Sequence, residues 1–137
     1  MSVILNPYLG FRGNAKEATD FYHSVFGGDL IRSTFGEMNA SVDPAEQDLI
    51  MHSQLTSGAI NLMASDTPKH MDYTAGDNFS VSLSGAQADD ATLRGYWNKL
   101  ADGGTIEQPL VVAPWGDAFG MLRDRFGIRW LVNIAAA

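Results

Sequence analysis

The chain has 137 residues, of which 45% are hydrophobic and 18% are charged. This is the length of one ordinary domain, with enough apolar material for a core and too little charge for a disordered chain. Cysteine is absent, which excludes disulfides, thiolate nucleophiles and thiolate-bound metals. The net charge of −7 repels nucleic-acid phosphates, so we expect no nucleic-acid partner.

The amino terminus has no basic segment followed by an apolar run, which excludes a typical signal peptide. Every apolar stretch is much shorter than the ~20 residues that a membrane-spanning helix needs. We therefore expect no membrane partner and a cytoplasmic location, with which the lack of cysteine agrees.

The first elements of the chain predict a strand followed by a helix. Residues 3–11 are apolar, with Pro7 placing the strand at a sheet edge or close to its beginning, because proline cannot donate to a ladder. Asn14 and Glu17 have the spacing of a capping box. One apolar helical stripe follows, made of Ala18, Phe21, Tyr22 and Val25. Two glycines at 27 and 28 end this helix.

Three further strands are predicted before the middle of the chain, at residues 29–38, 49–55 and 59–64, with a polar loop at 39–46. Residues 67–77 are polar and carry Pro68 and Gly76, which indicates a linker.

The same order is predicted again after this linker. A strand at residues 79–83 precedes a second helix opened by Asp89 and Asp90, whose charges suit the positive end of a helix. The second apolar stripe consists of Leu93, Tyr96, Trp97 and Leu100. Three more strands are predicted, at residues 105–112, 118–123 and 128–134.

The two halves align with an offset of 75 residues, which places Tyr22 on Trp97, Val25 on Leu100 and Gly28 on Gly103. An internal duplication explains this agreement. We predict a single α+β domain of two βαβββ modules, about residues 3–66 and 78–135, whose curved mixed sheet surrounds a cleft. Junctions of this kind are common binding places for small molecules.

Several motifs carry a resemblance to a known family. They are residues 10–22 (GFRGNAKEATDFY), 51–55 (MHSQL), 62–66 (LMASD), 115–120 (WGDAFG) and 124–130 (DRFGIRW). Together and in this order, they resemble the PhnB-like branch of the vicinal-oxygen-chelate superfamily, which includes glyoxalase, bleomycin-resistance proteins and dioxygenases. The resemblance implies a homodimer of paired modules with a cleft for a small organic ligand.

In the metalloenzymes of this superfamily, His and Glu on the first and last strand of each module hold a divalent ion. Ungapped matching puts these four positions near Pro7, Asn61, Phe79 and Trp130, and a shift of one residue offers Tyr8, Asn78 or Ser80. None of these residues is a His or a carboxylate, whereas a catalytic divalent ion needs about three such ligands. We therefore expect no metal cofactor of the glyoxalase type.

Other chemistry is predicted at only a few polar residues. His52 and Gln54 share one face of a strand by period two, and His52 is interpreted either as a site residue or as a packed or interface histidine. His23 and His70 are expected to be solvated. The turn carboxylates Asp66, Asp117 and Asp124 are expected to bond backbone groups. The arginines at 123, 125 and 129 are expected to be outward-facing strand charges.

Aromatic side chains are the more promising group. Tyr8, Trp115, Phe119 and Trp130 lie on or beside the strands that should line the cleft, and Trp130 is expected to point into it. Their rings either stack against a ligand or fill the cleft. The predicted ligand-binding residues are Tyr8, His52, Gln54, Asn61, Trp115, Phe119 and Trp130.

The sequence therefore favours a metal-free protein that binds a small molecule in an aromatic-lined cleft. Two alternatives stay open. One is a lyase, isomerase or dioxygenase with a shifted metal site at His52 and nearby carboxylates, and the other is a structural or interaction dimer without a ligand. A glycine-rich strand-to-helix loop of the kind that binds a nucleotide-bearing cofactor is absent from the sequence.

Overall fold

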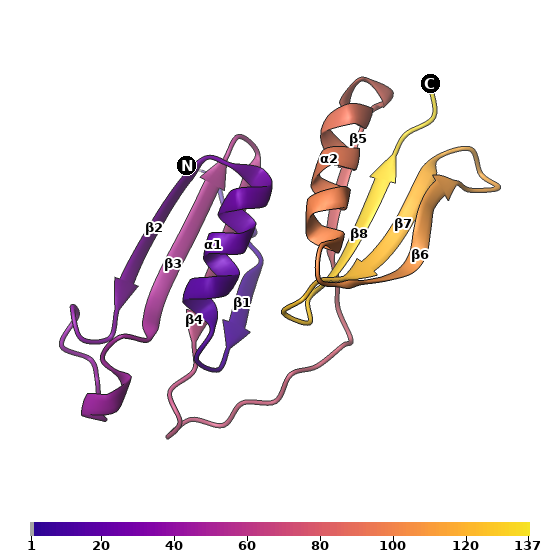
Figure 1. Ribbon diagram of the computed structural model, residues 1–137. Helices are drawn as coiled ribbons and strands as arrows, with labels where there is room; N and C mark the ends of the chain where they lie inside the picture. Colours follow the sequence, from indigo (N-terminus) through magenta and orange to yellow (C-terminus); the bar gives the residue numbers. More distant parts are fainter. Residues whose placement is uncertain (1) are drawn as a thin grey trace. The chain divides into compact units, whose positions relative to one another are not determined.

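A computed structural model describes residues 2–137. The chain divides into two compact units, of which the first ends at Thr74 and the second is Ala75–Ala137 (Figure 1). Each unit consists of one four-stranded sheet and one long helix.

The first unit has four strands, one α-helix and a short 3-10 helix. They are β1 Tyr8–Phe11, α1 Ala15–Phe26, β2 Asp29–Thr34, η1 Pro44–Glu46, β3 Ile50–Ser57 and β4 Ile60–Asp66. The strand order across the sheet is β1-β4-β3-β2. β1 runs parallel to β4, while the pairs β4–β3 and β3–β2 are antiparallel.

The second unit repeats this arrangement. Its elements are β5 Val81–Gly85, η2 Gln87–Asp89, α2 Asp90–Ala101, β6 Thr105–Val112, β7 Ala118–Arg123 and β8 Arg129–Ile134. The strand order is β5-β8-β7-β6, and β5 is parallel to β8. Both helices have 12 residues and are related by the offset read from the sequence. The predicted α+β fold of two βαβββ modules is confirmed.

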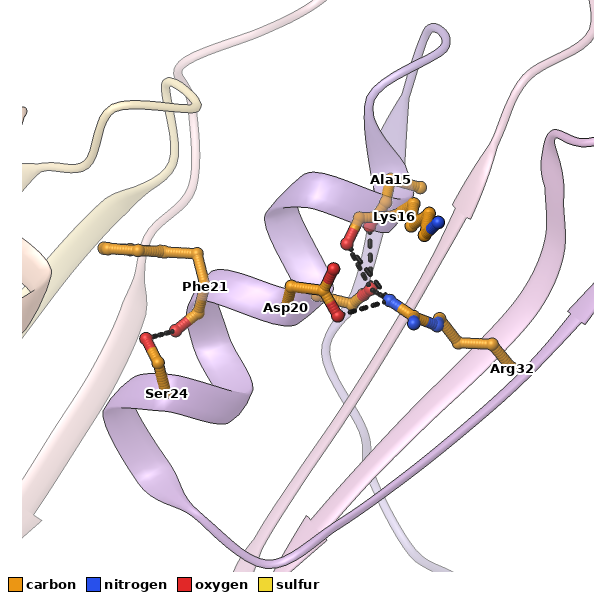
Figure 2. Close-up of polar contacts among 7 residues, drawn as sticks. Ala15, Lys16, Asp20, Phe21, Ser24 and Arg32 are labelled. Carbon is orange, nitrogen blue, oxygen red and sulfur yellow. Dashed lines mark hydrogen bonds and ion pairs between the residues drawn. The ribbon is translucent and has the colours of Figure 1, made fainter.

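In the first unit, α1 covers one face of the sheet and buries Ala18, Tyr22 and Val25 of the predicted stripe, while Phe21 is only half-buried. Tyr22 is completely buried, and Leu9 and Leu55 on the facing strands are 2% and 1% exposed. Arg32 of β2 adds a polar tie, because its guanidinium donates to the Lys16 carbonyl at 3.1 Å and to Asp20 at 2.7 Å (Figure 2). The helix is therefore held by its apolar face and at its outer edge.

The start of α1 is capped differently from the prediction. The Asn14 side chain makes no capping hydrogen bond, so the capping box of Asn14 and Glu17 is wrong. Instead, Oδ1 of the buried Asp66 accepts from the N–H groups of Gly13 at 2.8 Å and Ala15 at 3.0 Å. A carboxylate at the end of β4 takes over the acceptor function, which a local sequence pattern cannot reveal.

The core of the second unit is built around two tryptophans. Trp130 of β8 is 1% exposed, and Trp97 of α2 is 6% exposed. A Cβ atom at Gly120 would lie 2.7 Å from Cη2 of Trp97 and 2.9 Å from the Leu110 Cα. The ring of Trp97 therefore needs a glycine beneath it on β7.

The first strand is shorter than predicted, since residues 3–7 are not in a strand and pairing starts where the Pro7 carbonyl accepts from Met63. The strand predicted at 29–38 ends at Thr34, where a register shift interrupts its ladder with β3. The predicted loop at 39–46 contains η1.

Much of the predicted linker at residues 67–77 is fixed to the first unit. The N–H of Thr67 donates to the Phe11 carbonyl at 2.7 Å, and Pro68 is buried. Arg12 donates to the Met71 carbonyl at 2.8 Å and lies 5.4 Å from the centre of the Tyr73 ring.

No helix within residues 2–137 has the length and apolar character needed to cross a membrane.

Replacing Asp66 by alanine tests the capping arrangement. The carboxylate also accepts from the Ile50 N–H at 2.9 Å, so its loss leaves three backbone donors without their acceptor. We expect the free energy of unfolding of the first unit to fall by about 3 kcal/mol. Urea denaturation followed by circular dichroism measures this change. The exposed Asp72→Ala is the control, and equal stability of the two variants would contradict the prediction.

Candidate functional site

The face of the first sheet that points away from α1 is the best candidate for a site, and we call it the open face. Because neighbouring residues alternate in direction, the residues beside the buried Leu9, Leu55 and Leu62 point to this side. One cross-strand row runs through the open face in register, from Tyr8 to Met63, Gln54 and Ile31.

Two predicted site residues meet at one end of this row. The hydroxyl of Tyr8 lies 3.2 Å from Nδ1 of His52, and the centres of the two rings are 5.9 Å apart. Tyr8 is 50% exposed, so the pair is accessible from the solvent. A phenol and an imidazole in this contact can hold a polar group of a ligand and pass a proton between them.

A chain of three amides lies beside this pair. Nε2 of Gln54 donates to Oδ1 of Asn61 at 3.0 Å, and Nδ2 of Asn61 donates to Oδ1 of Asn6 at 2.6 Å. The structure therefore brings the predicted residues Gln54 and Asn61 together. Asn6 was not among the predicted site residues, although the strand predicted at residues 3–11 would have put it on the same face as Tyr8 by period two.

The open face carries phenol, imidazole, amide and thioether groups, and none of the side chains described above is a carboxylate or an ammonium group. The amides already bond to one another, so their orientation is set without a ligand. Asp29 adds a carboxylate to this face, in the row of Thr56 and Asn61, but the groups around Tyr8 and Gln54 include no carboxylate or ammonium group and therefore suit an uncharged polar molecule.

In the second unit, the predicted residues Trp115 and Phe119 form an aromatic pair with ring centres 6.2 Å apart. Trp115 is 66% exposed and lies in the turn between β6 and β7. Behind it, Asp117 accepts from Nδ2 of Asn133 at 3.1 Å and from the N–H of Ala136 at 2.9 Å. The Ala136 N–H and, to a lesser degree, the Asn133 amide lower the pKa of Asp117 below its ordinary 3.8.

Trp130 differs from the expectation that its ring points into a cleft. It pairs with Leu122 and Val81, on the face that α2 covers, and its Nε1 donates to the buried Asp124 at 2.9 Å. Because one residue reverses the face in a strand, the ring lies on the opposite side of β8 from the one that the ungapped match predicted. The Trp130 ring is a core residue.

The remaining candidate residues bond to backbone groups or to surface carboxylates of their own unit. Asp124 accepts from the N–H groups of Phe126 and Ile128, so the expectation of a turn carboxylate is confirmed there. Nε2 of the exposed His23 contacts the Gly28 carbonyl at 2.9 Å. The three arginines bind carboxylates at the surface: Arg123 and Arg129 to Glu107, and Arg125 to Asp102.

The donors of the open face do not fit a divalent metal ion. Near the position of a ligating His or Glu stands Asn61, whose Oδ1 already accepts from Gln54. His52 contacts the phenol oxygen of Tyr8, which is not among the usual ligands of a divalent metal ion. Within residues 2–137, no three side chains of the kind His, Asp or Glu gather closely enough to bind a metal.

Comparison with known proteins identifies the family. The model of the 3-demethylubiquinone-9 3-methyltransferase family matches residues 4–133. The crystal structure of protein PA1353 from Pseudomonas aeruginosa is 37% identical, covers 99% of this chain and 100% of its own, and has a TM-score of 0.82. A PhnB protein from Bacillus cereus, a putative 3-demethylubiquinone-9 3-methyltransferase, is 24% identical over 97% of this chain and 100% of its own, with a TM-score of 0.77.

The fold is shared more widely. A member of the glyoxalase/bleomycin resistance protein/dioxygenase superfamily from Sphaerobacter thermophilus has a TM-score of 0.60 at 14% identity, over 98% of both chains. These matches confirm the resemblance to the PhnB-like branch and the glyoxalase-type fold.

The titration of Asp117 tests its contacts with Asn133 and Ala136 in the second unit. Its carboxylate bonds only in the folded state, so the folded pKa lies below the unfolded pKa. The stabilisation is therefore present above the unfolded pKa and is lost as the pH falls through the folded one. In an NMR titration of the Asp117 carboxyl carbon, we expect a midpoint below 3.8 that moves upward in Asn133→Ala. An unchanged midpoint in that variant would rule out the contribution of the amide.

Metal titration tests the donor set. We expect calorimetry with Mn²⁺, Ni²⁺ or Zn²⁺ to show no stoichiometric site, because one imidazole surrounded by amides and a phenol supplies too few anionic or nitrogen ligands. The His52→Ala variant should give the same heats as the unchanged protein. Saturable binding of one ion per chain that disappears in His52→Ala would contradict this expectation.

Proposed function

The chain belongs to the 3-demethylubiquinone-9 3-methyltransferase family, and we propose that it binds a small, uncharged organic molecule on the open face of its first sheet, without a divalent metal. The observation that supports this proposal most directly is the amide chain from Gln54 through Asn61 to Asn6, next to the contact of Tyr8 with His52.

The composition of the open face suggests the chemistry of the ligand. Tyr8 and Met63 provide a phenol ring and a thioether, and Ile31, which is 73% exposed, extends the apolar surface of the same row. A flat apolar body fits on these groups, because rings and thioethers contact such bodies favourably. Carbonyl or hydroxyl groups at the ligand's edge would bond to Gln54 and His52.

The polar groups of this face favour recognition over non-specific contact. Amides held by one another lose little conformational entropy when a ligand arrives, and an unpaired buried amide would penalise a ligand that lacks a matching group. We include in the proposal that the working form is a homodimer, which light scattering of the purified protein can determine.

A ligand search followed by variants tests the proposed function. The purified protein is examined by native mass spectrometry for a co-purified molecule and by thermal shift against uncharged aromatic metabolites. A true ligand at 100 times its dissociation constant stabilises the fold by about 2.7 kcal/mol, which is measurable. We expect Gln54→Ala to weaken the binding of such a ligand about tenfold, because one ligand hydrogen bond is lost.

The matched control is Gln87→Ala, an exposed glutamine of η2 in the second unit. It should bind as the unchanged protein does, and Tyr8→Phe should bind more weakly. If no compound raises the melting temperature, or if all variants bind equally, the open face is not a ligand site and a structural or interaction dimer becomes the better explanation.

A further inference from the structure

The first unit contains a second concavity, at the end of its sheet where β2 stops and β4 ends. The cavity has a volume of about 340 Å³, which is within the range of sites for small ligands. Its inner wall includes Phe35, Met51, Ser65 and the buried Pro68, and Val42 and Met71 stand at its exposed rim. The four open-face residues Tyr8, His52, Gln54 and Asn61 do not line it.

Two segments form the walls, the loop between β2 and β3 and the residues after β4, and ionic contacts hold them together. Nζ of Lys69 lies 2.5 Å from Oδ2 of Asp43, and the N–H of Lys69 donates to Oε2 of Glu46 at 3.0 Å. In addition, Arg12 donates to the carbonyl of Met71, a residue of the cavity rim, at 2.8 Å. Both walls are thus fixed before any ligand is present, which lowers the ordering cost of binding.

Exposed ion pairs by themselves add little to the stability of a fold. In the clamp of Lys69 with Asp43 and Glu46, the two carboxylates and the ammonium group come from segments that would otherwise be separate surface loops. What these contacts define is the position of one wall relative to the other, and therefore the shape of the cavity.

The cavity has no free charge on its lining. Asp66 is the one carboxylate that lines it, and its two oxygens accept from the N–H groups of Gly13, Ala15 and Ile50. The nearby Asp43 is paired with Lys69, whose hydrogen bond lowers the Asp43 pKa. A charged ligand would lose hydration here without gaining an available counter-charge.

We propose that this cavity is a second ligand site, which takes an uncharged, flat molecule of one or two rings with one hydrogen-bonding group. The ring contacts Phe35 and the thioethers of Met51 and Met71, which are favourable partners for aromatic groups. The hydrogen-bonding group is directed to the Ser65 hydroxyl or the His70 imidazole. Ser65 belongs to the same face of β4 as Met63, but the open-face residues Tyr8, His52, Gln54 and Asn61 lie outside the lining, so the two sites can be tested separately.

Indole is a suitable probe, because it is flat, uncharged and carries one N–H donor. We titrate it into the full chain and follow the backbone amides by two-dimensional NMR. The expected result is a saturable set of shifts at Phe35, Met51, Ser65 and His70, with the amides of Tyr8, Gln54 and Asn61 unchanged. Shifts confined to those three open-face amides, or no saturable shifts, would overturn the proposal.

Two matched substitutions test the location. Ala40→Trp puts a ring into the cavity from its lining, and we expect indole binding to weaken at least about tenfold. Ala45→Trp adds the same ring to η1 outside the lining and should bind as the unchanged protein. Amide dispersion in the NMR spectrum shows that each variant is folded. Equal affinity of Ala40→Trp and Ala45→Trp would disprove the site.

A third pair of variants tests the clamp. Lys69→Met removes the ion pair with Asp43 and should weaken indole binding about threefold, while Arg94→Met breaks an exposed pair on α2 and should have no effect. If Lys69→Met binds indole as tightly as Arg94→Met does, the clamp does not shape the cavity.

Discussion

Each sheet of this protein has two faces but only one long helix to cover them, and this constraint decides where its chemistry can lie. In the first unit, α1 packs on the side of Leu9, Leu55 and Leu62, so the alternate residues are left to another use. A sheet face that stays without a helix must carry polar groups or meet another surface. Here it carries Tyr8, His52, Gln54 and Asn61.

Buried carboxylates secure this arrangement at the strand ends. Asp66 closes the start of α1 and fixes Ile50 at the start of β3. Asp124 has the corresponding effect on the other unit, since it ties the turn before β8 to the indole of Trp130. These groups join elements that are distant in sequence, and each is fully supplied with donors. They therefore fix the positions of the strands, and their own charges lie in the interior.

The helices and their glycine stops could be predicted from the sequence, because a stripe such as Leu93, Trp97 and Leu100 reports burial directly through its period. The repeat followed from the same stripes. Strand positions were less secure, since residues 3–7 were predicted as part of a strand from their apolar character and yet β1 begins only at Tyr8. The face of Trp130 could not be fixed for a related reason. A strand period of two turns a shift of one residue into the opposite side of the sheet.

Contacts between distant segments were beyond the reach of the sequence. Nothing local indicates that Asp66 caps α1 or that Lys69 closes a cavity with Asp43.

The exchange of ligating side chains for amides and rings changes the kind of molecule that this fold can hold. A carboxylate on a sheet face needs a cation or a proton to offset its lost hydration when a ligand covers it. Gln54, Asn61 and Asn6 are linked by two hydrogen bonds, and covering their remaining amide donors and acceptors requires matching groups on the ligand but no ion. The same reasoning applies to the cavity at Met51, where every nearby carboxylate already has its donors. In both places the groups that would touch a ligand are largely uncharged, on a chain with a net charge of −7. Its selectivity must then rest on shape and hydrogen-bond matching, with charge confined to the outer surface.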